Sequence, residues 1–372
     1  MSGVIQRQFV AAQAEGESWG SVAKACADHL TPLPPGANLG FLYVTDALAG
    51  DLGSILTFLR ERTRIADWAG SVGLGVAATG RDYFATPAIS VLVAALPPNA
   101  FRLFTPAAPA LQATDGWFER VRPLIGIVHG DPRDEGIGAA VAALAHAAPL
   151  YLVGGLAAAS EAPVQVAGRV VEGGLSGVLL APEIAVITGL SQGCSPIGPT
   201  HRITEARDNV IAALDGRPAL QVFKEDIGEA LARDLRRVAG LIFAGFPVAG
   251  SDTGDYLVRN LVAIDMKQQS LGVAHRVAPG ERVLFCRRDP SSAAADLERM
   301  LRDLKRRAQS PPRAGLYFSC IARGPSLFAE PHQELTMIRN ALGDFPLAGF
   351  FGNGEIAHDR IYGYTGVLAL FL

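Results

Sequence analysis

The sequence GLYFSCIARG (315–324), together with FPLAGFFGNGEIAHDRIYGYTGVLALF (345–371), decides the fold of this chain. Residues 315–321 are apolar and rich in aromatic and β-branched types, and glycines bound the run on both sides. A short apolar run of this kind predicts a buried strand. The two stretches form the most complete unit of secondary structure that the sequence predicts.

The residues after this strand predict a helix and two more strands. From Glu334 onward apolar residues recur at helical spacing, and Gly343 is placed to end the helix. Strands are predicted at Leu347–Phe351 and Ile361–Phe371, on either side of residues 352–355, whose Gly and Asn favour a tight turn. The order of elements is strand, helix, strand, strand.

Two earlier segments follow the same order. One runs from PLIGIVHG to SGVLLA (123–181), and the other runs from LGFLYVT to ISVLVAAL (39–96). In each, a helical pattern separates two strand patterns and a further strand pattern follows. The sequence therefore predicts an α/β fold with mixed (α+β) sheets, in which repeated strand-helix-strand-strand units form two packed domains.

Several ordered motifs identify a family that this chain resembles. They are GLSQGCSPIG (189–198), NVIAALDGRPALQVFKEDIG (209–228), RRDP (287–290), YFSCIARG (317–324) and GFFGNGEI (349–356). They closely resemble the FIST family, which pairs a FIST N-terminal domain with a FIST C-terminal domain. The resemblance implies a cytoplasmic sensory protein that binds small ligands such as amino acids. No kinase, chemotaxis, cyclase or F-box segment is visible, so a separate signalling partner is expected.

The domain boundary is predicted near the turn at 215–218, which follows a Gly/Ser/Pro-rich loop at 189–200 and a predicted helix at Glu205–Leu214. The prediction divides the chain into an N-terminal helical segment (1–35), a FIST N-terminal-like domain (36–215) and a FIST C-terminal-like domain (216–372).

The charge balance argues against nucleic acid as a partner. Thirty-three basic and 36 acidic residues give a formal charge of −3, so no broad positive field is expected. The basic run at 299–307 contains acidic residues at i,i+4 spacing and is interpreted as a solvated helix face. Residues 137–160 carry no charge, but Pro149 divides them into a buried helix and a buried strand, so no membrane segment is predicted.

The cysteine and histidine spacing favours neither disulfides nor a metal site. The four cysteines include no CxxC pair, which is typical of a reducing cytoplasm, and no histidine lies at zinc-like spacing. The run at 73–78 mimics a dinucleotide fingerprint but does not open a helix. No cofactor and no metal are therefore expected.

The preferred ligand site lies at the end of the strand that Cys320 closes. Arg323 and Gly324 follow this strand, and Asn353 and Glu355 follow the next one, so a right-handed crossover would open both loops onto one sheet edge. Arg323 could hold a carboxylate, Glu355 an amino group, and Asn353 either. The alternative is a simple tight turn in which Arg323 and Glu355 pair with each other.

Three further residues are weaker candidates. Asp131 could bind an ammonium group, although it also suits the start of a helix. Arg202, predicted on a flexible loop, could grip a carboxylate or could form a surface salt bridge. Cys194 could be a nucleophile with His201 as its base, or a buried small hydrophobe.

The resemblance implies a cytoplasmic sensor without catalysis, and the charged loop residues favour a small polar metabolite resembling an amino acid or related carboxylate as its ligand. One alternative is a hydrolase or transferase with a cysteine nucleophile, Cys194 or Cys320. The other is a protein-interaction scaffold without a ligand.

Overall fold

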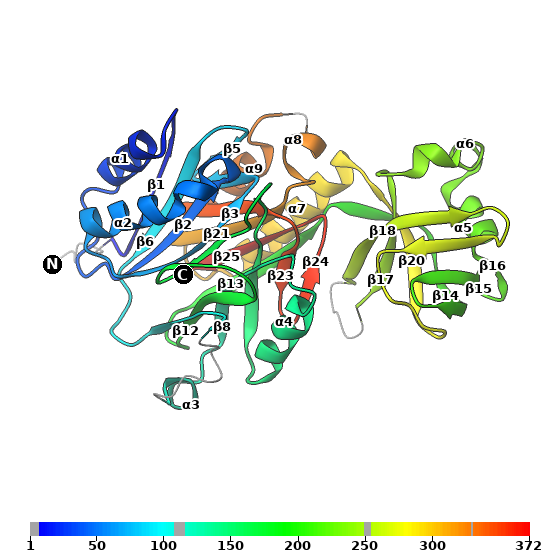
Figure 1. Ribbon diagram of the computed structural model, residues 1–372, viewed down its shortest axis with the longest axis horizontal. Helices are drawn as coiled ribbons and strands as arrows, with labels where there is room; N and C mark the ends of the chain where they lie inside the picture. Colours follow the sequence, from blue (N-terminus) through cyan, green and yellow to red (C-terminus); the bar gives the residue numbers. More distant parts are fainter. Residues whose placement is uncertain (1–6, 108–115, 249–253, 329) are drawn as a thin grey trace. The chain divides into compact units, whose positions relative to one another are not determined.

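The computed structural model describes residues 7–107, 116–248, 254–328 and 330–372, so the first six residues of the predicted N-terminal segment lie outside it. It is a mixed α/β protein, as predicted (Figure 1). The chain forms two compact units. Met1–Ser191 and Leu297–Leu372 make the repeat unit, and Gln192–Asp296 make the barrel unit. The domain boundary predicted near residues 215–218 stays a prediction.

The repeat unit contains the strand-helix-strand-strand order three times, each time with additional elements. The first repeat has β1 (Phe9–Glu15), α1 (Trp19–His29), β2 (Leu39–Thr45), η1 (Asp46–Asp51), α2 (Leu52–Thr63), β3 (Asp67–Gly73), β4 (Gly75–Ala78), β5 (Arg81–Phe84) and β6 (Ala88–Ala94). The second has β7 (Phe101–Phe104), α3 (Trp117–Val121), β8 (Ile125–Gly130), α4 (Ile137–His146), β9 (Tyr151–Leu156), β10 (Gln165–Ala167), β11 (Val170–Val171) and β12 (Leu175–Leu180). The third has β13 (Val186–Gln192), α7 (Pro290–Arg307), β21 (Ala314–Cys320), α8 (Gly324–Leu327), α9 (Gln333–Leu342), β22 (Leu347–Gly352), β23 (Glu355–Ala357), β24 (Arg360–Tyr362) and β25 (Thr365–Phe371).

The three repeats share one pairing scheme. The central strand of each, β2, β8 or β21, pairs in parallel with the strand after its helix and antiparallel with the last strand. The small hairpin between these strands extends a different repeat's sheet: β4–β5 joins β22, β10–β11 joins β3, and β23–β24 joins β9. Each six-stranded sheet is therefore completed by another repeat.

Glycines at one equivalent position confirm the repetition. Gly70, Gly154 and Gly349 each lie in the strand after the helix, beside the central strand of the same repeat. At each of them a Cβ atom would overlap with a carbonyl oxygen of the neighbouring strand. Only glycine fits this close approach.

Helices cover one face of every sheet in the repeat unit. Apolar residues of α1 and α2 pack in the core of the first repeat, those of α3 and α4 in the second, and those of α7 and α9 in the third. Away from these helices, the central strands contribute the aromatic cluster of Tyr43, His129 and Phe318, which Phe350 joins. The rings of Tyr43 and His129 lie 5.6 Å apart, and that of Phe350 lies 5.4 Å from Tyr43. Burial lowers the pKa of His129 to about 3, so the cluster is an uncharged core.

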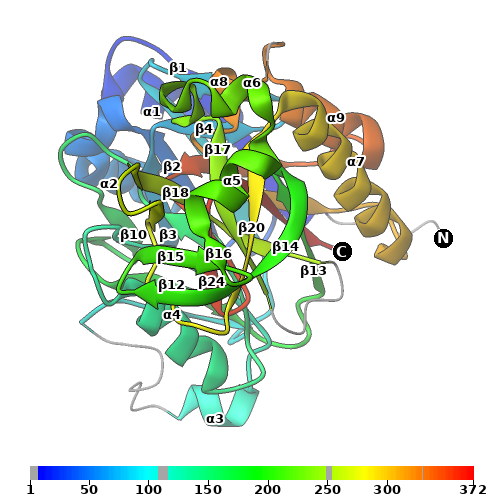
Figure 2. The same ribbon diagram turned by 90° about the vertical axis from the view of Figure 1, so that its right-hand side faces the viewer.

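The barrel unit is a closed antiparallel sheet (Figure 2). Its strands follow the order β14-β20-β17-β18-β19-β15, and β14 pairs again with β15, which leaves no open edge among these six. Apolar residues of α5 pack in its core. The elements are β14 (Cys194–Arg207), β15 (Val210–Leu214), β16 (Arg217–Pro218), α5 (Ala219–Ile227), α6 (Glu229–Ala232), η3 (Leu235–Val238), β17 (Ile242–Pro247), β18 (Tyr256–Asp265), β19 (Ser270–Val273) and β20 (Arg282–Arg288).

Two sequence predictions are wrong in this region. The helix expected at Glu205–Leu214 is a hairpin between β14 and β15, because Asp208 adopts a left-handed backbone with φ of 54° and the flanking residues pair across the barrel. The loop expected at 189–200 is largely strand. Gly198 and Pro199 are accommodated by a bulge in β14, where the register with β20 shifts between Ile197 and His201.

The uncharged run at 137–160 is divided between helix α4 and strand β9, as predicted. Among the described residues, no helix combines the length and the apolar character needed to cross a membrane.

Candidate functional site

The carboxyl ends of the parallel strands β21 and β22 form the core of the candidate site. These strands are adjacent, as the crossover argument predicted, and their last paired residues are Cys320 and Gly352. The chain then turns sharply, and the amide of Arg323 donates to the carbonyl of Cys320. Arg323 is fully buried, and Cys320, Gly324 and Glu355 are buried as well. The structure thus brings four of the predicted residues into one buried region.

Arg323 pairs with a residue that the sequence reasoning missed. Its Nε and Nη2 atoms lie 2.9 and 2.8 Å from Oε1 of Glu334, which projects from the first turn of α9. Tyr317 and Ser319 donate hydrogen bonds to the same carboxylate at 2.7 and 3.0 Å. Burial alone would lower the pKa of Arg323, but the Glu334 carboxylate more than offsets it and raises that pKa. The predicted alternative, an Arg323–Glu355 pair, is therefore wrong.

Glu355 enters the region from the start of β23. Its Oε2 atom accepts hydrogen bonds from the amide and the hydroxyl of Thr365, at 3.1 and 2.7 Å. Burial raises the pKa of Glu355 to about 8, although Thr365 and the charge of Arg323 act in the opposite direction. Within the described structure, Oε1 of Glu355 and Nη1 of Arg323 are buried without a hydrogen-bond partner. One buried acceptor and one buried donor thus remain without a partner, and the two residues that carry them interact electrostatically.

A cavity of about 210 Å³ adjoins this polar network. Its wall includes Glu334 and Gly324, so the residue that binds Arg323 also lines the cavity. The other lining residues are Asp82, Pro325, Phe328, Glu330, Pro331, His332 and Gln333.

The exchanged hairpin of the first repeat contributes to this cavity. Oδ1 of Asp82, on β5, lies 2.7 Å from Nδ1 of His332, the residue that precedes α9. The ring of Phe84, also on β5, packs against Gly324, where a Cβ atom would approach it to 2.6 Å. The hairpin exchange therefore builds one wall of the site.

Asn353 does not join the buried cluster. Its side chain is exposed, and its backbone amide donates to the carbonyl of Leu156 in the second repeat. The Gly-Asn-Gly sequence here serves the turn between β22 and β23.

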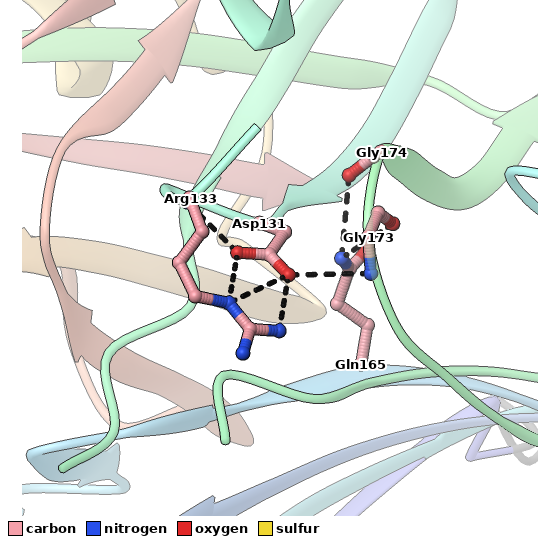
Figure 3. Close-up of polar contacts among 5 residues, drawn as sticks. All are labelled: Asp131, Arg133, Gln165, Gly173 and Gly174. Atoms are coloured by element: carbon pink, nitrogen blue, oxygen red, sulfur yellow. Dashed lines mark hydrogen bonds and ion pairs between the residues drawn. The ribbon is translucent and has the colours of Figure 1, made fainter. Parts of the chain in front are cut away.

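Asp131 lies at the corresponding strand end of the second repeat, directly after β8 (Figure 3). It is buried and accepts hydrogen bonds from the backbone and guanidinium of Arg133 and from the amide of Gly173. Burial alone would raise the pKa of Asp131, but these bonds, led by the Arg133 side chain, lower it. Arg133 in its own loop and Gly173 before β12 together satisfy this carboxylate.

The candidates Cys194 and Arg202 belong to the barrel unit, whereas Arg323 and its network belong to the repeat unit. The side chain of Cys194 is buried, and its interaction with Cys286 raises the pKa of the Cys286 thiol. Arg202 is exposed on strand β14 rather than on a flexible loop, and its backbone amide donates to Asp215. Neither residue faces the described cavity.

The structure argues against a Cys194–His201 pair. Both ring nitrogens of His201 are occupied by carboxylates, Asp215 at 2.7 Å and Asp226 at 2.8 Å. The two residues are also seven positions apart on one strand, which corresponds to roughly 20 Å even with a bulge. Burial raises the pKa of Cys320 to about 12, so its thiol is poorly suited to act as a nucleophile.

One sequence signal could have revealed Glu334. It precedes Leu335 and Ile338 on the buried face of α9, where a charged residue interrupts the apolar stripe. A buried carboxylate requires a partner, and Arg323 is the last Arg or Lys that precedes this helix in the sequence.

The fold and the site define a mixed α/β protein with a buried polar network at its strand ends and a cavity of metabolite size beside it. Residues 38–217 match the FIST N domain, and residues 219–358 match the FIST C domain. The chain therefore belongs to the FIST family. FIST domains are generally sensory domains that bind ligands in signal transduction.

Two mycobacterial proteins illustrate the relatives. The uncharacterized protein Rv0628c of Mycobacterium tuberculosis (strain ATCC 25618 / H37Rv) is 34% identical over 214 residues, covering 55% of each chain. The uncharacterized protein Mb0898c of Mycobacterium bovis (strain ATCC BAA-935 / AF2122/97) is 33% identical over 212 residues, covering 55% of this chain and 54% of that protein. The chain spans about half the length of these relatives.

Proposed function

We propose that this chain is a cytoplasmic sensor that binds a small amino-acid-like metabolite at the carboxyl ends of β21 and β22. It acts without catalysis and passes its state to a separate signalling partner. The observation that carries the proposal is the pair of open polar atoms, Nη1 of Arg323 and Oε1 of Glu355.

Leaving such atoms unpaired is costly. A buried donor or acceptor without a partner costs about 1–3 kcal/mol, and native proteins contain few of them. A zwitterion supplies one complement to each atom, because its carboxylate accepts from a guanidinium and its ammonium donates to a carboxyl oxygen. In this proposal Arg323 holds the ligand's carboxylate, and Glu355 holds its amino group.

The neighbouring cavity supports a small ligand. Its volume of about 210 Å³ lies below the roughly 300–1,000 Å³ of pockets that hold drug-sized molecules. Glu334 connects the cavity with the network, since it lines the one and binds Arg323 in the other. A ligand entering the cavity would meet this ion pair, and a shift of Glu334 would expose Arg323 to it.

The proposal is tested by thermal unfolding with matched compounds. L-alanine carries both groups, propionate lacks the amine, and ethylamine lacks the carboxylate. A zwitterion at ~100 times its dissociation constant adds about 2.7 kcal/mol of stability and raises the midpoint by several degrees. A panel of amino acids that leaves the midpoint unchanged would favour a scaffold without a ligand.

Conservative variants locate the site. Arg323→Lys keeps the charge but removes the forked donor, and Glu355→Gln keeps the shape but can no longer become the carboxylate that would pair with an ammonium group. Both are expected to abolish the shift. Glu183→Gln and Arg233→Lys, at exposed positions, are the matched controls and are expected to retain it.

A further inference from the structure

We infer that the ligand carries a second, cationic group on its side chain, which Asp82 recognises at the outer part of the cavity. This inference rests on the proposed function and adds to it a ligand class, the amino acids with a basic side chain. The recognising residue comes from the first repeat, whereas the network around Arg323 belongs to the third.

The charges of the cavity wall point to a cation. Three of the nine lining residues, Asp82, Glu330 and Glu334, carry carboxyl groups, and none is Lys or Arg. Glu334 is already bonded to Arg323, so its charge is compensated. Asp82 has the imidazole of His332 beside it and Glu330 is exposed, so the lining offers a ligand carboxyl groups but no Lys or Arg, which disfavours a second acidic group on the ligand.

The side chain of Asp82 is mostly buried, which distinguishes it from a solvated surface charge and suits it to recognise a ligand. Its side chain is 12% exposed, and its Oδ1 atom lies 2.7 Å from Nδ1 of His332. Burial raises the pKa of Asp82, and it outweighs the opposite effect of His332, so the carboxylate is incompletely stabilised. A cationic group at hydrogen-bonding distance would supply the missing stabilisation.

The rest of the wall suits the stem of a basic side chain. Phe328, Pro325 and Pro331 provide apolar surface in the cavity lining. Methylene groups pack on such surface while the charged end stays with polar partners. An aromatic ring also attracts a nearby cation.

Calorimetric titration with three ligands tests the inference. L-lysine, L-norleucine and Nε-acetyl-L-lysine share the backbone groups and differ at the side-chain end. We expect lysine to bind at least tenfold more tightly than the other two, because hydrogen bonds to charged groups are worth about 1.5–3 kcal/mol. Equal affinity for lysine and norleucine would overturn the inference and leave the proposed function standing. Failure of all three to bind would contradict both.

The variant Asp82→Asn tests whether Asp82 causes the preference for lysine. It is expected to remove the advantage of lysine without weakening norleucine, while Asp208→Asn, at an exposed turn, keeps the advantage. A lysine preference that persists in Asp82→Asn would overturn the assignment. The acetyl-lysine comparison needs no variant, so it decides the charge requirement even if Asp82→Asn fails to fold.

Discussion

The ends of the second and third repeats share one backbone plan but treat their polar groups differently. Gln165 and Glu355 occupy equivalent positions in their repeats. Gln165 pairs with the residue after the close-packed Gly70, and Glu355 pairs with the residue after its counterpart, Gly154. Gln165 is hydrogen-bonded to Ser176 in either orientation of its side-chain amide, and its other amide atom also has polar partners. Glu355 keeps one buried oxygen without a partner in the described structure.

The connecting loops show the same contrast. In the second repeat, residues 131–136 lead directly from β8 to α4, and Arg133 covers Asp131. In the third repeat, residues 321–332 include α8 and leave a cavity beside Arg323. Repetition thus supplies the scaffold, while loop length and side chains decide which strand end can bind a ligand.

Removing Glu334 should have the largest effect on stability. Glu334→Gln leaves the buried guanidinium of Arg323 without its counter-charge, and breaking a buried pair costs about 3–5 kcal/mol. Asp131→Asn is the comparison in the second repeat, where Arg133 is half exposed and can turn to water. We expect about 1–2 kcal/mol there, from the hydrogen bonds alone. Urea unfolding measures both, and equal losses would contradict the contrast between the two strand ends.

Glu355 should make stability depend on pH. Its pKa is raised to about 8 in the folded protein and is about 4.3 in an unfolded chain. Between these values the folded state holds a proton that the unfolded state has released, so the contribution of Glu355 to stability is fully present below about pH 4.3 and is lost as pH rises through 8. The slope reaches about 1.4 kcal/mol per pH unit.

Two substitutions check the origin of that slope. Glu355→Gln should flatten the unfolding free energy between pH 5 and pH 8 by removing the proton-binding group. Gln165→Glu should introduce a slope of the same sign in the second repeat, where a carboxylate would replace a neutral amide. An unchanged slope in Glu355→Gln would show that other groups cause it.

The barrel unit should respond to pH through His201. Burial alone would lower the pKa of His201, but its bonds to Asp215 and Asp226 raise it, so that both ring nitrogens donate. The stabilisation is fully present below the unfolded pKa of about 6.5 and is lost as pH rises through the folded value. Proton NMR of the imidazole should show a pKa above 6.5 that Asp226→Asn lowers. A value below 6.5 would contradict this account.

Asn353 should have the smallest effect. Its side chain is exposed, so Asn353→Ala is expected to change stability by no more than about 0.5 kcal/mol. Ligand-induced stabilisation should also be unchanged. A lost ligand response would return Asn353 to the site and would argue for a binding surface outside the buried network.

Local patterns predicted the repeated elements but not the way they are exchanged. The apolar run ending at Cys320 and the helical spacing after Glu334 are local, so the sequence indicated β21, α9 and their parallel neighbour. The pairing of β4 with β22 joins residues far apart in the chain, and no local period encodes it. The sequence therefore could not predict that Asp82 lines the cavity.

Only part of the candidate site was predicted, because the rest depends on contacts between distant segments. Strand-end logic located Cys320, Arg323 and Glu355, because loops after parallel strands meet at one edge. It could not indicate that Arg323 pairs with Glu334, since burial and pairing depend on how α9 packs on the sheet. At Glu205–Leu214 the barrel pairing overrode a helical pattern.

The most direct test of the ligand site compares two conservative variants at the two strand ends. Thermal unfolding is measured with and without the most stabilising amino acid for the wild type, Arg323→Lys and Arg133→Lys. The account predicts that the ligand-induced rise in midpoint disappears in Arg323→Lys and persists in Arg133→Lys. A rise that survives in Arg323→Lys, or that is lost only in Arg133→Lys, would contradict the assignment of the ligand to the third repeat.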